Sequence, residues 1–227
     1  MWDHLPPVIV YSRHPQCEHN IDHESALARG IKNRHSPLTK AGEIQRDVTA
    51  AYLKKEFPSI DGVFCSTYHR TRTLPEAAGL ANLMVEDNRL DERNMGVWHV
   101  HGSNEVLKRY PGEDSRLKEM GYYHYLAPDG ETCVHVEDRH MGFLSDKQVF
   151  SDRKVMYISG HGISGLCLRK VLTGGSLEDW LAYERLANAS VSVYQKFGDR
   201  YICALWNHIP WAGQIDPELL KKISHEV

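Results

Sequence analysis

Short apolar runs that alternate with helical segments place the strongest constraint on how this chain of 227 residues can fold. β-Branched and aromatic residues form candidate strands at 8–11, 63–65, 83–85, 155–158, 190–195 and 201–205. The segments between most of them have helical patterns, clearest at 41–51, where apolar residues recur on one helix face. This alternation predicts an α/β fold with three layers, α/β/α, around a mostly parallel central sheet.

The pattern changes between about residues 94 and 151. This stretch is rich in Gly, Tyr, His and charge, and Pro111 and Pro128 interrupt it. We interpret it as an inserted segment of loops and short helices over the sheet edge and the active site, within a single domain spanning 1–227. Thr39 and Thr132 are the expected N-caps of two helices. Other helices are expected at about 69–82, at 178–185 and from about Pro217.

Composition narrows the classes of function. The formal net charge is −3, so no basic field attracts nucleic acid or an anionic membrane. No apolar run approaches the roughly 18 residues of a membrane span, and the N-terminus lacks the features of a signal peptide. An odd number of cysteines without a C-x-x-C pair suggests a reducing, cytoplasmic location. The cysteines are Cys17, Cys65, Cys133, Cys167 and Cys203.

Two histidines directly follow the ends of candidate strands. Arg13-His14 follows the first candidate strand, at 8–11, and His161 follows the late candidate strand, at 155–158. In open α/β sheets, ligand sites form beyond the carboxyl ends of the strands. We therefore expect His14 and His161 to share one site, with Arg13 and Asn20 beside them.

This combination of groups suits a phosphoryl group. A guanidinium fork matches two phosphate oxygens, and the helix N-terminus expected after His161 adds backbone N–H groups. A neutral imidazole nitrogen can attack phosphorus in line and become a phosphohistidine. The leaving alkoxide needs a proton, so a carboxylic acid is expected nearby.

Six segments, taken in order, extend this pattern over nearly the whole chain. They are Arg13-His14-Pro15-Gln16-Cys17-Glu18-His19-Asn20, Ser36-Pro37-Leu38-Thr39 with Gly42 and Gln45, Ser66-Thr67-Tyr68-His69-Arg70-Thr71, Leu90-Asp91-Glu92-Arg93 with Gly96, Ser159-Gly160-His161-Gly162, and Leu186 to Val193 with Asn188. Together they resemble the signature blocks of the histidine phosphatase (phosphoglycerate mutase-like) superfamily. Any one block is weak evidence, whereas six in register are strong evidence.

The resemblance implies a role for each matching residue. His14 would be the phosphorylated nucleophile, with His161 as the second catalytic histidine. Glu92 would protonate the leaving oxygen and then activate water, a contribution on the order of 10²–10⁴ in rate. The implied phosphate-binding residues are Arg13, Asn20, Arg70 and His161. The implied enzyme is a phosphoric monoester hydrolase for a small phosphorylated substrate or a phosphopeptide, without cofactor or metal.

One departure from the family pattern raises an alternative. Pro15 stands where the family usually has glycine, and proline fixes φ and lacks an N–H for a ligand. The chain is then a candidate for a phospho-ligand-binding or low-activity family member that binds vanadate without turnover.

A phosphoglycerate-type mutase is the other alternative, and it needs extra cations for a substrate carboxylate. Candidate cations are Arg89, Arg93, Lys108, Arg109 and Arg116. The sequence Glu92-Arg93-Asn94-Met95-Gly96 departs from the mutase-like E-R-x-Y-G form, and the insertion is short for a mutase lid. We therefore favour a phosphatase.

Several polar residues remain open to two interpretations. The acid has rival carboxylates, Glu86, Asp87, Asp91 and Glu131. The cluster Tyr122, Tyr123, His124 and Tyr125 either packs the insertion or forms a substrate rim, which Glu131 would extend. His99 and His101 alternate as metal ligands can, but a third ligand has no obvious place, so ordinary polar roles are favoured. The sequence predicts neither the substrate nor the oligomeric state.

Overall fold

A six-stranded sheet runs through the middle of the computed structural model, which describes residues 3–146, 150 and 153–215. The strands are β1 (Val8–Arg13), β2 (Gly62–Cys65), β3 (Met84–Glu86), β4 (Val155–Gly160), β5 (Val191–Phe197) and β6 (Arg200–His208), in the order β3-β2-β4-β1-β5-β6. The first four of this order pair in parallel, while β5 pairs antiparallel with both β1 and β6. The sheet is therefore mixed and mostly parallel, as the sequence predicts.

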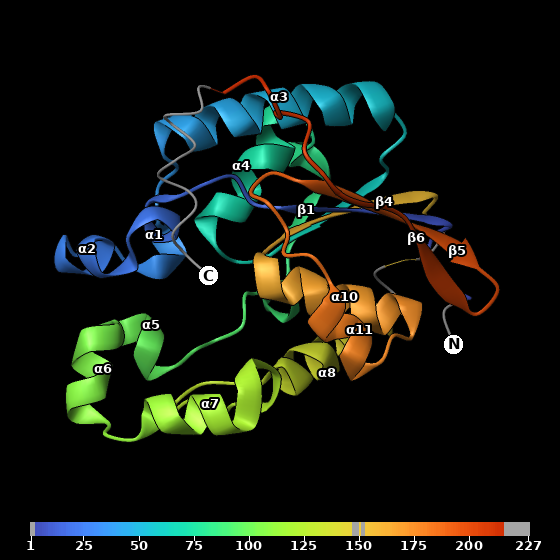
Figure 1. The fold of residues 1–227 in the computed structure, drawn as a ribbon. Helices are drawn as coiled ribbons and strands as arrows, with labels where there is room; N and C mark the ends of the chain where they lie inside the picture. Colours follow the sequence, from blue (N-terminus) through green and yellow to red (C-terminus); the bar gives the residue numbers. More distant parts are fainter. Residues whose placement is uncertain (1–2, 147–149, 151–152, 216–227) are drawn as a thin grey trace.

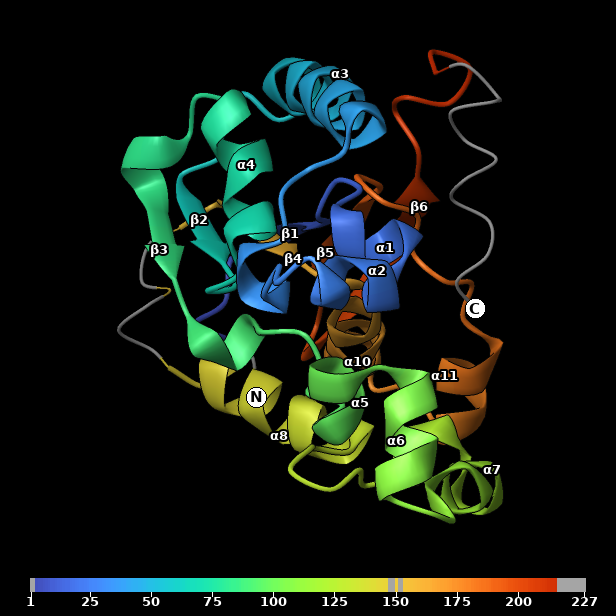
Figure 2. The same cartoon turned by 90° about the vertical axis from the view of Figure 1, so that its left-hand side faces the viewer.

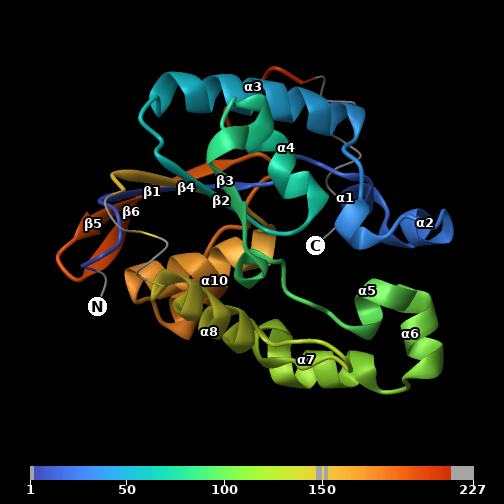
Figure 3. The ribbon, with the colours of Figure 1, turned by 180° about the vertical axis from the view of Figure 1, so that it is seen from behind.

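Helices cover both faces of the sheet. Lying on one face are α3 (Lys40–Glu56) and α4 (His69–Ala77), and on the other lie α8 (Cys133–Leu144), α10 (Gly162–Thr173) and α11 (Leu177–Ala182) (Figures 1 and 3). Successive side chains of the central strands point to opposite faces of the sheet and pack against the helices on each face. On β1, Val10 packs with Leu53 of α3, whereas Ile9 packs with Leu168 of α10. This gives the predicted three-layer arrangement.

The ends of the parallel strands open toward a set of short helices. These are α1 (Glu18–Ile21) and α2 (His23–Ala28) on one side, and α5 (Val97–His101), α6 (Ser103–Arg109) and α7 (Glu113–His124) on the other. Figure 2 views this end, with α1 and α2 in front of β1 and β4, and α5 facing them. The short 3₁₀ helices are η1 (Asn33–His35), η2 (Ala81–Leu83) and η3 (Asn88–Leu90).

Sequence signals set several helix ends as expected. The Thr39 hydroxyl accepts from the Gly42 N–H at the start of α3, and the Thr132 hydroxyl accepts from the His135 N–H at the start of α8. The helix expected at 69–82 ends at Ala77, because Gly79 takes a φ of +75° and reverses the chain.

Two other helix predictions have different outcomes. The helix expected at 178–185 is α11, which ends at Ala182 because Tyr183 is extended. The helix expected from about Pro217 lies outside the described residues. Within the described ranges, no helix combines the length and apolar character needed to cross a membrane.

Candidate active site

Neighbouring strands bring the two histidines of the predicted site together. Arg13 at the end of β1 is in register with Gly160 at the end of β4, and the His14 N–H donates to the Gly160 carbonyl at 2.9 Å. The rings of His14 and His161 lie edge to face with centroids 5.2 Å apart. Residues separated by almost 150 positions therefore meet because their strands pair in parallel.

The His14 ring is held in one tautomer. Its Nδ1 lies 2.7 Å from the Pro15 carbonyl oxygen, which can only accept, so Nδ1 carries the proton. The opposite nitrogen, Nε2, therefore keeps its lone pair in the neutral ring. Burial, and then the positive charges of Arg70 and Arg13, lower the pKa of His14 well below its usual value. His14 is thus a neutral imidazole with a free lone pair at Nε2.

Pro15 replaces glycine without disturbing this arrangement. The contact to His14 uses the Pro15 carbonyl, which every residue type supplies. The following residue is fixed by helix α3: the Gln16 N–H donates to Gln45 Oε1 at 2.8 Å, and the Thr39 N–H donates to the Gln16 carbonyl at 3.1 Å. The backbone N–H and the backbone carbonyl of Gln16 are therefore both held in place by hydrogen bonds.

Two arginines flank His14, of which Arg70 is buried and Arg13 is half-buried. Arg13 donates from Nη1 to the Leu186 carbonyl at 2.6 Å, and Arg70 donates from Nη1 to the Asn33 carbonyl at 2.7 Å. In both side chains the buried Nε has no hydrogen-bond partner among the residues that the structure describes. A buried guanidinium N–H without a partner is costly, and an anion in the pocket would satisfy it.

Asn20 lies beside His14 at the end of α1. Its Oδ1 accepts from the Cys17 N–H at 3.1 Å and from Asn188 Nδ2 at 3.2 Å. Asn188 Nδ2 also lies 3.0 Å from the His14 carbonyl, so both asparagines are tied to the loop that carries His14. Since the Asn20 oxygen is occupied, its amide nitrogen remains as a donor for a ligand.

A relay of hydrogen bonds fixes His161. Its Nε2 lies 2.8 Å from Ser66 Oγ, and the Ser66 hydroxyl donates to Asp91 Oδ1 at 2.8 Å. Because the Ser66 proton goes to the carboxylate, Ser66 must accept from His161 Nε2–H. His161 Nδ1 then faces Arg70 Nη2 at 3.5 Å. Burial, followed by the charge of Arg70, lowers the pKa of His161 well below its usual value.

Glu92 occupies the N-terminus of helix α10. Its carboxylate accepts backbone N–H bonds from Ser164 at 2.9 Å, from Ile163 at 3.2 Å and from Arg93 at 2.9 Å. The sequence predicts that these helix N–H groups face the phosphate. That prediction is wrong for Ile163 and Ser164, because the carboxylate takes the favourable end of the helix dipole.

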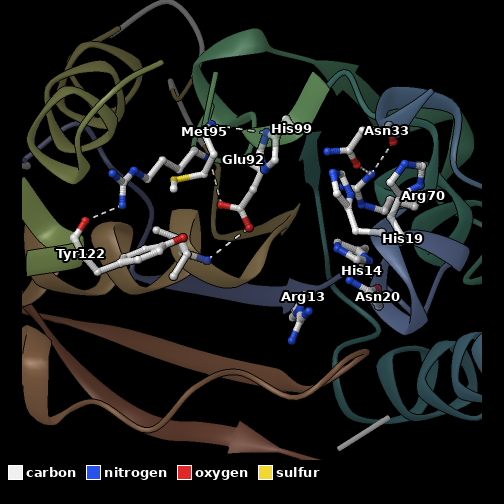
Figure 4. A pocket seen from close by; sticks show the side chains of 13 residues that line it. Arg13, His14, His19, Asn20, Asn33, Arg70, Glu92, Met95, His99 and Tyr122 are labelled. Atoms are coloured by element: carbon white, nitrogen blue, oxygen red, sulfur yellow. Dashed lines mark hydrogen bonds between the residues drawn. The ribbon is translucent and has the colours of Figure 1, made fainter. Parts of the chain in front are cut away.

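The side chains of Arg13, His14, Asn20, Arg70 and Glu92 border one pocket of about 260 Å³, and His161 lies behind this lining. Figure 4 shows His14, His19, Asn20 and Arg70 on one side of it and Glu92, Met95, His99 and Tyr122 on the other. Its lining consists of Arg13, His14, His19, Asn20, His23, Asn33, Arg70, Glu92, Arg93, Met95, His99, Tyr122 and Ile163. The geometry offers a nucleophilic nitrogen, unpaired guanidinium N–H groups and a carboxyl group around one cavity.

Comparison with known proteins identifies the family of this site. The model of the histidine phosphatase superfamily (branch 1) matches residues 9–209. The chain belongs to this superfamily. Among curated proteins, none matches the sequence significantly.

Solved structures share the fold of this histidine phosphatase superfamily member. Mycobacterial glucosyl-3-phosphoglycerate phosphatase in complex with VO3 has a TM-score of 0.68 at 22% identity, over 89% of this chain and 99% of that chain. Alpha-ribazole phosphatase from Shigella flexneri has a TM-score of 0.71 at 18% identity, over 88% and 96%. Bacillus stearothermophilus YhfR has a TM-score of 0.73 at 18% identity, over 89% and 97%.

The rival carboxylates all have other partners. Asp91 binds Ser66, Thr67 and Arg34, whereas the other three pair with single arginines outside the pocket. These pairs are Glu86 with Arg72, Asp87 with Arg89, and Glu131 with Arg139. Glu92 is the carboxylate that borders the His14 pocket within the described part of the chain.

Most of the candidate substrate rim lies elsewhere. Tyr122 lines the pocket, but Tyr123 is buried against Glu137, with its hydroxyl 2.6 Å from Oε1, and Tyr125 donates to Glu113 at 2.7 Å. His124 is exposed. Successive side chains at the end of α7 point in different directions, so a cluster in sequence is not a cluster in space.

Glu131 and the histidines considered as metal ligands occupy different surroundings. Glu131 borders a second, adjoining pocket that shares Glu92 with the first. His99 and His101 lie on a helix rather than on a strand, so their side chains do not share a face. No group of three or more His, Cys, Asp or Glu side chains within 3–146, 150 and 153–215 is arranged to hold a metal ion.

Several pocket residues were not predicted from the sequence. His19 and His23 come from α1 and α2, while Asn33 holds Arg70 from η1. His19 sits at a variable position of the signature block, so no motif indicates its role. The available signal is the unusual number of histidines, 14, which exceeds what the predicted chemistry uses.

Proposed function

We propose that this protein hydrolyses phosphate monoesters through a phosphohistidine on His14. The observation that carries the proposal is the hydrogen bond from His14 Nδ1 to the Pro15 carbonyl. It leaves a lone pair on Nε2 beside the unpartnered Nε groups of Arg13 and Arg70. A nucleophile, anion-binding groups and a carboxyl group in one cavity are what phosphoryl transfer requires.

In the first step, His14 Nε2 attacks phosphorus and the bond from phosphorus to the alcohol oxygen breaks. Arg13, Arg70 and Asn20 hold the phosphoryl oxygens, and Glu92, entering as the carboxylic acid, gives its proton to the departing oxygen. His14 becomes positively charged as the new bond forms. The Pro15 carbonyl stabilises this charge through its bond to Nδ1–H.

In the second step, water replaces the alcohol. Glu92, now a carboxylate, takes a proton from water, whose oxygen attacks phosphorus as the bond to His14 Nε2 breaks. Neutral His14, inorganic phosphate and the acid form of Glu92 are restored. The three backbone N–H groups that hold Glu92 keep one carboxyl group positioned for both steps.

The charge distribution argues against the mutase alternative. Of the five candidate cations for a substrate carboxylate, only Arg93 lines the pocket, and its nitrogens bind the carbonyls of Glu131, Tyr122 and Tyr125. The other four pair with acidic side chains. These pairs are Arg89 with Asp87, Lys108 and Arg109 with Glu105, and Arg116 with Glu113.

Turnover of p-nitrophenyl phosphate in the presence of a chelator tests the proposal. We expect wild-type hydrolysis, and loss of at least 10³-fold in kcat for His14→Ala, as for other covalent nucleophiles (roughly 10³–10⁶). His35→Ala, an exposed histidine outside the pocket, should leave kcat unchanged. Vanadate binding without turnover would favour the binding-module alternative instead.

A cytoplasmic location remains a prediction from the cysteine content.

A further inference from the structure

Three histidines line the His14 pocket without a part in the proposed chemistry. They are His19 on α1, His23 on α2 and His99 on α5, which lie one after another across the pocket. The ring centroids are 5.0 Å apart for His19 and His23 and 6.0 Å apart for His23 and His99. We call His19, His23 and His99 the histidine wall. Two separate segments of the chain, the loop region after β1 and the insertion, build this wall.

The central evidence that the wall binds a ligand is His19. Only 6% of the surface of His19 is exposed, yet neither ring nitrogen has a hydrogen-bond partner within the described structure. His23 contacts backbone groups instead, with Nε2 at 3.3 Å from the Trp98 carbonyl and a further hydrogen bond to the His99 backbone. Buried polar atoms are almost always paired, so polar groups in the pocket are expected to complete these bonds.

The wall is uncharged near neutral pH. Burial, and then the charge of His23, lowers the pKa of His19 to about 4. Burial, and then His23 and Arg70, lowers the pKa of His99 to about 3, and burial also lowers the pKa of His23. The neutral His19 ring offers one donor and one acceptor, whereas His99 Nδ1 accepts from the Met95 N–H at 3.3 Å and so leaves its Nε2–H as a donor. Hydroxyl groups, which also donate and accept, complement such a surface.

The three residues of the histidine wall provide no cation for a second anion. The cationic side chains among the described pocket residues are Arg13, Arg70 and Arg93. All three side-chain nitrogens of Arg93 donate to backbone carbonyls, while Arg13 and Arg70 flank His14, where the phosphoryl group is expected. A carboxylate or second phosphate at the histidine wall would therefore lose its water without forming a direct ion pair with the wall.

We propose that the histidine wall binds the alcohol part of the substrate, and that the preferred substrates are monophosphates of uncharged, hydroxyl-rich alcohols such as sugars or polyols. This inference rests on the proposed function, because it assumes that the phosphoryl group lies at His14. It names the substrate class and makes His19 a specificity-determining residue.

A matched pair of esters tests the proposal. Glycerol 3-phosphate and 3-phosphoglycerate differ by one group, a CH₂OH against a carboxylate. At pH 7.5 we expect kcat/KM to be at least 10-fold higher for glycerol 3-phosphate. Equal or faster turnover of 3-phosphoglycerate would overturn the assignment.

Variants of the wall locate the preference. His19→Ala should lower kcat/KM for glycerol 3-phosphate about 10-fold, the effect of one lost hydrogen bond of about 1.4 kcal/mol. For p-nitrophenyl phosphate, which has no hydroxyl, the change should stay within about 2-fold. His19→Gln, which keeps a donor and an acceptor, should recover most of the loss. Equal losses on both esters would contradict a role in binding the alcohol.

Two controls separate this inference from the proposed hydrolysis. His101→Ala removes a histidine of the same helix as His99 that stacks on Tyr110 outside the pocket lining, and should leave the preference unchanged. Calorimetry of His14→Ala with both esters measures binding without turnover, and should give the lower Kd for glycerol 3-phosphate. Absent turnover by wild type would refute the hydrolysis, whereas tighter binding of 3-phosphoglycerate would refute the histidine wall assignment.

Discussion

At the scale of single residues, the chemistry depends on which nitrogen of each histidine carries the proton. The Pro15 carbonyl sets the tautomer of His14, and the Ser66 hydroxyl sets that of His161. The two partners differ in kind. A backbone carbonyl is present whatever the residue type, which explains how Pro15 can replace glycine here, whereas the Ser66 hydroxyl depends on Asp91 for its direction.

Replacing Asp91 therefore tests the relay. In Asp91→Asn the amide can donate to Ser66, which permits the hydroxyl to turn and donate to His161, reversing the tautomer of that histidine. We expect kcat/KM for p-nitrophenyl phosphate to fall by about 10-fold or more (at least ~1.4 kcal/mol). Thr67→Val, which removes another hydroxyl from Asp91 but keeps Ser66, should have a smaller effect. A larger loss for Thr67→Val would argue against the relay.

The proposed acid role of Glu92 predicts a dependence of the rate on the leaving group. Glu92→Gln keeps an oxygen for the Ser164 N–H but cannot supply a proton. For an alkyl phosphate, kcat/KM should fall by on the order of 10²–10⁴. For p-nitrophenyl phosphate the fall should be much smaller, because its leaving group departs without protonation. Equal losses for both esters, measured side by side, would exclude Glu92 as the acid.

At the scale of elements, helix α3 holds the loop that carries His14. A Cβ on Gly42, in the first turn of α3, would lie 1.9 Å from the Gln16 carbonyl oxygen. That carbonyl also accepts from the Thr39 N–H, so neither partner can move freely. The close approach explains a glycine in a helix, where it otherwise costs stability.

Alanine at two glycines separates this contact from helix propensity. Gly42→Ala should lower the free energy of unfolding by about 1–3 kcal/mol and also reduce kcat, because the loop at Gln16 must shift. Gly142→Ala, on α8 with no atom within 4 Å of the added Cβ, should be neutral or stabilise by up to about 1 kcal/mol. Urea unfolding and p-nitrophenyl phosphate assays measure both effects. Similar stabilities for the two variants would contradict the close packing.

Elements with a clear pattern could be predicted from the sequence, and the insertion only in outline. Residues 8–11 and 155–158 are continuous apolar runs because both strands are buried on both faces, and the pairing of these strands brings His14 and His161 together. In the insertion, Gly121 has a φ of +69° and breaks α7 just before Tyr122. A tertiary arrangement of this kind decides which aromatic side chain faces the pocket, and no local pattern encodes it.

Some residues of the candidate site could be placed from the sequence and others could not. Arg13, His14, Arg70 and His161 could be placed because their blocks begin at or next to the end of a strand. His19 and His23 could not, because their direction depends on how α1 and α2 pack against the insertion, which only the three-dimensional structure reveals.

At the scale of the whole molecule, several buried histidines make stability depend on pH. Burial lowers the pKa of six histidines: His14, His19, His23, His99, His140 and His161. The unfolded chain binds protons at these side chains near pH 6.5, whereas the folded protein does so only at lower pH, about 4 for His19 and about 3 for His99. The folded state therefore loses stability as the pH falls below about 6.5.

Urea unfolding at pH 7.5, 6 and 5 measures this loss. We expect the free energy of unfolding to decrease over this range, with a limit of about 1.4 kcal/mol per pH unit for each histidine. In His99→Gln one titrating group is removed, so the decrease should be shallower than in the wild type. A free energy of unfolding that stays constant or rises on acidification would contradict the buried neutral histidines.

The central claim is that His14 becomes covalently phosphorylated, and trapping the intermediate tests it most directly. Rapid quenching in alkali preserves a phosphohistidine, which can then be located by peptide mass spectrometry. We predict phosphate on His14 in the wild type, its loss on acid treatment, and greater accumulation in Glu92→Gln with p-nitrophenyl phosphate, because hydrolysis of the intermediate is slowed. Turnover without any phosphate on His14, or phosphate on another residue, would contradict this account.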